Sequence, residues 1–323
     1  MKNLIFCCDG TANALAHRRL PEDDERMPQR RHHTNVAHLY QRLPKHLPHQ
    51  IARYQPGVGT YQLAKTQRTG RLGLWRGKLF GHGLIANIEN GYHFLMQHYE
   101  PGDAVFLFGF SRGAYAVRAL SGMLQHCGLL LQAHAELVPE ATRLYHRKGA
   151  KAACLAFRNQ YSQPCPVRFM GIWDTVSSLG FFYQHRHFFD ARLSPIVMQG
   201  THALAIDEQR PKFEPELWDE TRVQPQQTVQ QMWFRGSHAD VGGGYDDRGL
   251  AEISLGWMQR QATQAGLILD PDAQPTQPPN PNGTIHEPWN SLQGRVLRLL
   301  FGGLKPRQVG ELQHPSVAER GRP

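Results

Sequence analysis

The stretch AVFLFGFSRGAYAVRAL, residues Ala104–Leu120, constrains the fold of this chain more than any other feature. Its first seven residues form a continuous apolar run, which is typical of a strand buried on both faces of a sheet. Its second half has the apolar spacing of a helix. At the joint, Gly109 and Gly113 bracket Ser111, and a GxSxG sequence between a strand and a helix is typical of a nucleophile elbow. We therefore predict a sharp turn that lifts the Ser111 hydroxyl above the carboxyl end of the sheet.

Strand and helix patterns alternate in the first half of the chain, which predicts an α/β fold. The expected architecture is α/β-hydrolase-like, with a mostly parallel central sheet flanked by helices. We expect one catalytic domain over residues 1–323, a long basic loop at about 57–83 and a partly disordered tail after 308. The expected strands are 4–8, 50–55, 104–110, 167–173 and 229–234, and the expected helices are one capped by Thr34 and those at 84–99, 114–124 and 249–265.

A serine nucleophile needs a base and an acid, and in this fold the acid and then the histidine follow the serine, each just past a strand. Asp174 directly follows the strand 167–173, and His238 lies in the glycine-rich stretch SHADVGGGY after the strand 229–234. Asp240 is the alternative acid, although it could equally bind backbone N–H groups of its own loop. We favour Asp174 because a residue two positions from a histidine seldom holds the ring in line.

An oxyanion hole requires two N–H donors. We expect one from Arg112, which follows the serine, and the other from Gly10 or Thr11 in the loop after the first strand. Asp9 is expected to hold this loop through its carboxylate. The DGT triplet also occurs in aspartyl phosphatases, but there another aspartate precedes it by two positions, and here that position is Cys7.

Charge and composition limit the classes of binding partner and the cellular compartment that we expect for this protein. The net charge of +9 favours anionic partners such as a membrane surface, but no nucleic-acid motif accompanies it. Five cysteines without a CxxC spacing indicate reduced thiols. No apolar run approaches the roughly 18 residues of a membrane span, and the first apolar run is too short for a secretory signal. We therefore expect synthesis in the cytoplasm.

We predict no metal ion and no cofactor. Four aspartates have the hard oxygen atoms that Ca²⁺ prefers, but their spacing matches no defined loop motif. These residues are Asp9, Asp240, Asp246 and Asp247.

Seven stretches together resemble the motif set of an α/β-hydrolase family that contains phospholipase effectors of bacterial type VI secretion. They are CDGTAN, YQPGVGT, GLIANIENGYHFLMQHYEPGD, FLFGFSRGAYAVRAL, GIWDTVSSLG, HALAIDEQR and WFRGSHADVGGGY. The family usually reads FFDGTGN at the first site, where this chain has Cys8 and Ala12. The HPSV at 314–317 also resembles the ending of the family, so the resemblance covers nearly the whole chain.

The resemblance implies a Ser-Asp-His triad at Ser111, Asp174 and His238, and hydrolysis of phospholipid acyl esters. It also implies export by a type VI-like route, with a secretion-apparatus or immunity partner. Larger members carry extra membrane-docking segments, whereas we expect this chain to be little more than the catalytic core, so a housekeeping or orphan hydrolase of the same family is an alternative. A hydrolase of small soluble esters and a catalytically silent interaction module are the other two hypotheses.

Two basic stretches are candidates for contact with lipid. The segment 57–78 mixes leucine and tryptophan with arginine and lysine, so it is either an interfacial lid or an ordinary surface loop. The stretch SLQGRVLRLLFGGLKPR, Ser291–Arg307, is basic and amphipathic, and is either a membrane contact or a helix packed on the core.

Overall fold

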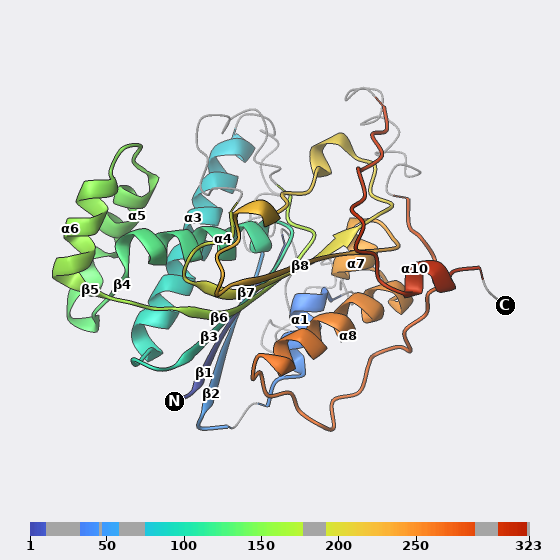
Figure 1. Ribbon diagram of the computed structural model, residues 1–323, viewed down its shortest axis with the longest axis horizontal. Coiled ribbons are helices and arrows are strands. Elements are labelled where there is room, and N and C mark those ends of the chain that lie inside the picture. The colour runs from blue at the N-terminus through green and yellow to red at the C-terminus, as the bar shows by residue number, and fades with distance from the viewer. Residues whose placement is uncertain (11–32, 45–46, 58–74, 177–191, 288–302, 322–323) are drawn as a thin grey trace, which may run out of the picture.

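A central sheet of six parallel strands organises the molecule (Figure 1). The computed structural model describes residues 1–10, 33–44, 47–57, 75–176, 192–287 and 303–321. The strand order is β2-β1-β3-β6-β7-β8, and a separate antiparallel pair joins β4 to β5. The strands are β1 (Asn3–Cys8), β2 (Gln50–Gln55), β3 (Ala104–Phe110), β4 (Leu129–Leu130), β5 (Ser162–Gln163), β6 (Val167–Trp173), β7 (Val197–Ala205) and β8 (Thr228–Phe234).

Helices cover both faces of the sheet, and the alternation of strand side chains gives each face its own core. Leu4 and Phe6 of β1 point into the core beneath α3, α4, α5 and α6, whereas Ile5 and Cys7 point into the core beneath α1 and α8 (Figure 1). The helices are α1 (Asn35–Gln41), α3 (Trp75–His98), α4 (Arg112–Cys127), α5 (Val138–His146), α6 (Lys151–Tyr161), α7 (His238–Gly242), α8 (Gly249–Gln264) and α10 (Ser316–Glu319), with 3₁₀ turns η1 (Gln132–Leu137), η2 (Pro211–Phe213) and η3 (Glu220–Arg222).

The strand order places a topological switch point between β1 and β3. From β1 the chain adds β2 on one side and β3 on the other, and the parallel pairing sets Cys8 opposite Gly109. Ligands of open α/β sheets bind beyond the carboxyl ends of the strands at such a point. The predicted neighbourhood of β1 and β3 is confirmed, and it puts Asp9 and Ser111 at one edge of the sheet.

The predicted strands and helices are present, but the structure also has elements that were not predicted, among them the helices α5 and α6. Strand β7 was not predicted, and it lies between β6 and β8. The predicted loop at 57–83 ends earlier, because α3 begins at Trp75. Single glycines cost a helix only about 1 kcal/mol each, so the glycines of this stretch do not prevent helix formation.

The tail after 308 is also more ordered than expected. The Trp233 N–H donates to the Leu312 carbonyl and the His314 N–H donates to the Trp233 carbonyl, so this segment runs parallel to the edge strand β8. Residues Ser316–Glu319 then form α10. Backbone pairing with an open sheet edge is the physical reason for the order.

Candidate active site

Ser111 lies at a strained joint between β3 and α4. Its backbone has φ 56° and ψ −119°, and its N–H donates to the Trp173 carbonyl at 3.0 Å. A Cβ on Gly113 would lie 2.1 Å from the Cys8 carbonyl oxygen, and one on Gly109 would lie 2.6 Å from the Ala114 backbone. Glycine is therefore required at both positions, as the sequence predicted. Such a backbone conformation costs of order 1–3 kcal/mol and is concentrated at functional sites.

The side chains of Asp174 and His238 are in contact at the carboxyl edge of the sheet. The Nδ1 atom of His238 lies 2.6 Å from Oδ2 of Asp174. Asp174 follows β6, the neighbour of β3, and His238 begins α7 just after β8. Among the described residues, Ser111 and Asp174, with φ 37°, are the two non-glycine residues that have positive φ. Backbone strain thus marks two of the three residues that the sequence selected.

The charge state of Asp174 fixes the role of each nitrogen of His238. Burial alone would raise the pKa of Asp174, but the Arg307 guanidinium and the hydrogen bond from His238 hold that pKa well below its usual range. Asp174 is therefore a carboxylate that accepts, and Nδ1 of His238 donates. The other ring nitrogen, Nε2, is the one that can accept a proton. Burial lowers the pKa of His238, against the opposing effect of Asp174, so the ring is neutral near pH 7.

Two aromatic rings lie beside the His238 ring and a charged pair lies at its backbone, and the sequence analysis selected none of these four side chains. The rings of Phe110 and Phe213 lie 4.6 Å and 5.0 Å from it, centroid to centroid. Glu208 accepts the His238 backbone N–H at 3.3 Å and forms an ion pair of 2.7 Å with Arg210. Both charged residues belong to the motif HALAIDEQR, which was the one sequence signal that could have indicated them.

Asp240 has a different set of partners from Asp174. Its carboxylate accepts from the Ser237 N–H at 2.8 Å, from the His286 N–H at 3.0 Å and from Nδ1 of His286 at 2.6 Å. Asp240 thus binds backbone N–H groups at the start of α7, which was the alternative role considered for it. Within the described part of the chain, the carboxylate bound to the His238 ring is that of Asp174.

Asp9 directly follows β1 and has three hydrogen-bond donors. Its buried carboxylate accepts from the Tyr54 hydroxyl at 2.5 Å, from the Thr34 hydroxyl at 2.8 Å and from the Gly10 N–H at 2.6 Å. Burial raises the pKa of Asp9 to about 6, against these three hydrogen bonds, which lower it.

The same contact corrects the expectation for Gly10. An N–H that donates to the Asp9 carboxylate is not available to an oxyanion at Ser111, because a buried carboxylate competes strongly for nearby donors. Thr11, the other expected donor of this loop, lies outside the described residues. Arg112 directly follows Ser111 and is the first residue of α4, at the positive end of the helix dipole.

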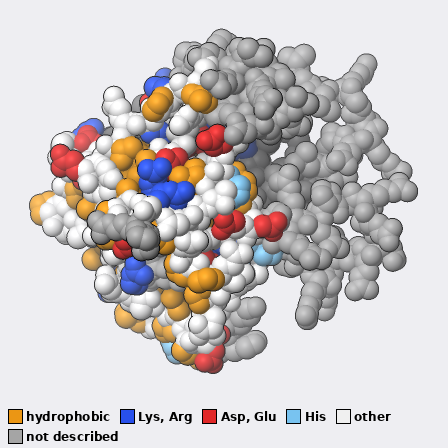
Figure 2. Space-filling view, turned by 90° about the vertical axis from the view of Figure 1, so that its right-hand side faces the viewer, with side chains coloured by type: hydrophobic (Ala, Val, Ile, Leu, Met, Phe, Trp, Pro, Cys, Tyr) orange, Lys and Arg blue, Asp and Glu red, His pale blue; other side chains and the backbone are white. Residues whose placement is uncertain are grey.

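Most of the two basic stretches, residues 58–74 and 291–302, lies outside the described residues. Where the structure does describe the chain, no group of three or more His, Cys, Asp or Glu residues is placed to hold a metal ion. No helix in these parts is long and apolar enough to cross a bilayer. On the face shown in Figure 2, basic, acidic and apolar side chains are interspersed over the described surface.

The parallel sheet and the strained serine at its strand–helix joint define an α/β-hydrolase-like protein. The chain belongs to the Tle1-like family of type VI secretion phospholipase effectors. The family model that matches residues 2–261 is described as "T6SS, Phospholipase effector Tle1-like, catalytic domain". The resemblance stated from the sequence is thereby confirmed.

Three relatives are similar to this chain. The "Uncharacterized protein YEL023C" of Saccharomyces cerevisiae is 31% identical over 231 residues, which are 66% of this chain and 32% of that protein. A crystal structure of an uncharacterized protein from Pseudomonas aeruginosa has a TM-score of 0.48 and 20% identity, covering 83% of this chain and 46% of that one. A structure of the Tle1 effector bound to the VgrG spike of the type VI system has a TM-score of 0.41 and 20% identity, covering 76% and 52%. The chain thus spans about a third of the yeast relative and about half of each solved structure.

Proposed function

We propose that the chain is a serine ester hydrolase that cleaves acyl esters of phospholipids, a phospholipase of the A type. Ser111 is the nucleophile, His238 the general base and Asp174 the acid that orients the imidazole. The observation that carries this proposal is the 2.6 Å contact between His238 Nδ1 and Asp174, at the sheet edge where the strained Ser111 lies. Membership of a phospholipase effector family supports lipid as the substrate class.

The proposed reaction uses the groups already described. Nε2 of His238 takes the proton of the Ser111 hydroxyl as its oxygen attacks the acyl carbonyl carbon, and Asp174 stabilises the imidazolium that forms. The imidazolium then gives its proton to the leaving alcohol, which leaves an acyl-serine. A water molecule, deprotonated by Nε2 of His238, then attacks the acyl carbon, and the imidazolium returns this proton to the Ser111 oxygen as the fatty acid leaves. The oxyanion is stabilised by the N–H of Arg112 at the positive end of α4, with Thr11 as the second expected donor.

A substrate panel tests the proposal. The wild-type chain is expected to react with a fluorophosphonate probe at Ser111, and to hydrolyse phospholipid in micelles faster than short monomeric esters. Faster hydrolysis of the monomeric esters would instead favour a hydrolase of small soluble esters. A folded chain that neither reacts with the probe nor hydrolyses any ester would be a silent interaction module.

The pH dependence of the reaction follows from the burial of His238. An ordinary histidine has a pKa of about 6.5. Because burial lowers the pKa of His238 and only the neutral ring can accept the serine proton, activity should persist into more acidic solution than that value suggests. The acid limb of the kcat/KM profile is expected to have its midpoint below about pH 6.5. Measurement with a non-ionising ester, alongside thermal melts at each pH, checks this, and a midpoint clearly above that value would contradict it.

Family membership also leads us to propose a route and partners for the chain. We propose synthesis in the cytoplasm and delivery by a type VI apparatus, with a component of that apparatus and an immunity protein as partners, and an anionic membrane as the surface on which it acts. Comparing export from cells with an intact and with an inactivated apparatus tests the route. Equal export from both would exclude it. We further propose that residues 1–323 act as one catalytic domain, because the segment 303–321 contacts the site itself.

A further inference from the structure

We infer that Arg307 is a positioning residue, which fixes the carboxylate of Asp174 against His238 and makes the C-terminal segment part of the active centre. The inference rests on the proposed function and deepens it. Arg307 lies 133 positions after Asp174 in the sequence and beyond residue 261, where the match to the family's catalytic domain ends.

The guanidinium of Arg307 donates hydrogen bonds to both carboxylate oxygen atoms of Asp174. One terminal nitrogen donates to Oδ1 at 2.6 Å, and the other donates to Oδ2, the oxygen that also accepts from His238, at 3.0 Å. The Arg307 side chain is 5% exposed and that of Asp174 is fully buried. Two parallel N–H···O bonds fix the plane of a carboxylate, and the Ala205 N–H, which donates to Oδ1 at 3.0 Å, adds one backbone contact to this pair.

The same guanidinium also contacts Phe213, one of the two aromatic residues beside the His238 ring. Its two terminal nitrogens donate to the carbonyls of Ala205 and Phe213 as well. The ring of Phe213 stands edge-on to His238 at 5.0 Å. Arg307 therefore ties together the end of β7, the turn η2 and the residue after β6, and so holds two of the groups that confine the imidazole.

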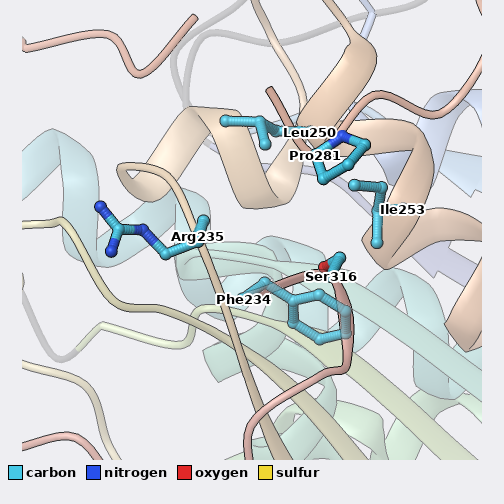
Figure 3. Close-up of a pocket in the computed structure, with 6 residues that line it drawn as sticks. All are labelled: Phe234, Arg235, Leu250, Ile253, Pro281 and Ser316. Carbon is cyan, nitrogen blue, oxygen red and sulfur yellow. The ribbon is translucent and has the colours of Figure 1, made fainter. Parts of the chain in front are cut away.

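The path of the C-terminal segment explains how Arg307 reaches this position. The Lys305 N–H donates to the Gln209 carbonyl at 3.0 Å, two residues before Arg307, and the Trp233 N–H donates to Leu312 five residues after it. Further along, Ser316 lines a narrow crevice with Phe234 of β8 and with Leu250 and Ile253 of α8 (Figure 3). The segment is thus attached to the loop after β7 on one side of Arg307 and to β8 on the other.

Arg307 acts on His238 through charge as well as through geometry. Asp174 faces three titratable or charged side chains: His238, Arg307 and His202, whose pKa burial lowers to about 3. His238 in turn faces Asp174, Arg210 and Glu208. Without Arg307, the negative charge of Asp174 would be compensated mainly by the imidazolium, and the carboxylate itself would be protonated more readily. Both effects move the acid limb of activity to higher pH.

The test compares Arg307→Ala and Arg307→Lys with the matched control Lys305→Ala. Lys305 lies in the same segment, but its ion pair with Glu214 is exposed, at 63% and 68%. Each protein is assayed for kcat, KM and the acid limb of kcat/KM, with active sites counted by fluorophosphonate labelling and folding checked by thermal melts. Counting active sites separates slower turnover from a loss of folded protein.

Arg307→Ala is expected to lower kcat about 10–100-fold, as the loss of an outer-shell partner does at metal sites, with KM little changed. Its acid limb should move up by about one pH unit or more. Arg307→Lys keeps the charge but not the paired donors, so its acid limb should stay near that of the wild type while kcat falls several-fold. Lys305→Ala should behave as the wild type.

An unchanged kcat and acid limb in a folded Arg307→Ala protein would overturn the inference. If Arg307→Ala does not fold, Arg307→Lys serves as the only test. A wild-type kcat for Arg307→Lys would then show that the two hydrogen bonds from Arg307 do not position Asp174, and would overturn the inference. A wild-type chain that neither labels nor turns over ester would instead refute the proposed function, so the two failures are distinguishable.

Discussion

Replacing Ser111 with alanine is expected to abolish ester hydrolysis while leaving the fold intact. In serine hydrolases the loss of the nucleophile alone lowers kcat by roughly 10⁶-fold. The hydroxyl of Ser111 contributes no side-chain hydrogen bond to the cap of α4, so the helix does not depend on it. Steady-state kinetics on phospholipid micelles, with circular dichroism as the folding control, measure both effects. Wild-type turnover in Ser111→Ala would remove this residue from the mechanism.

A companion variant, Ser111→Gly, separates strain from chemistry. Both variants lack the hydroxyl and should be equally inactive, but only glycine adopts φ 56° and ψ −119° without steric cost. Ser111→Gly should therefore melt at a higher temperature than Ser111→Ala, by an amount set by the roughly 1–3 kcal/mol of strain less the greater freedom of glycine in the unfolded chain. Equal melting temperatures would mean that the joint stores no strain.

Asp174→Asn is expected to have the second largest effect, lowering kcat by roughly 10⁴-fold. Asparagine tolerates the positive φ of this position, so the backbone should be retained. The neutral amide does not stabilise the tautomer of His238 that donates from Nδ1, as the carboxylate does. It also leaves the buried Arg307 without its counter-charge. Breaking a buried ion pair costs about 3–5 kcal/mol when one partner is lost, so kinetics should be read per labelled active site and below the melting transition.

Asp240→Asn is the matched control, since it removes a second buried carboxylate, which lies in α7 two residues after His238. Asp240 binds the N–H of Ser237 and the ring of His286, and its loss should weaken the start of α7 by about 1–2 kcal/mol. Its kcat per active site should fall far less than that of Asp174→Asn. The reverse ranking would exchange the roles of the two aspartates.

Much of the site was predictable because its signals are local. The elbow needs only an apolar strand, two glycines and a helix, all within Ala104–Leu120, and the structure bears out the steric reason for both glycines. Asp174 and His238 were predictable because parallel strands bring their carboxyl ends to one edge of the sheet, so a residue just past a strand is placed there whatever the loops do.

Strand β7 was missed because its sequence does not have the pattern of a buried strand. Its interior contains Gly200, Thr201 and His202, all three buried, where a continuous apolar run would be expected. The backbone of β7 pairs with the parallel strands β6 and β8. The side-chain ring of His202 accepts a hydrogen bond from the Thr175 N–H at 3.2 Å. The contact between the His202 ring and Thr175 joins residues 27 positions apart, so no local pattern could have indicated it.

The sequence by itself determined which residues lie at the carboxyl edge of the sheet, because strand alternation and the glycine-bracketed serine are short-range patterns. Only the tertiary structure decided which of these residues contact one another. The direction of the Gly10 N–H toward Asp9, the pairing of Asp240 with His286 and the grip of Arg307 on Asp174 depend on the paths of loops. No local pattern encodes a contact across 133 positions, because such an ion pair is selected by burial and by the geometry of the folded chain.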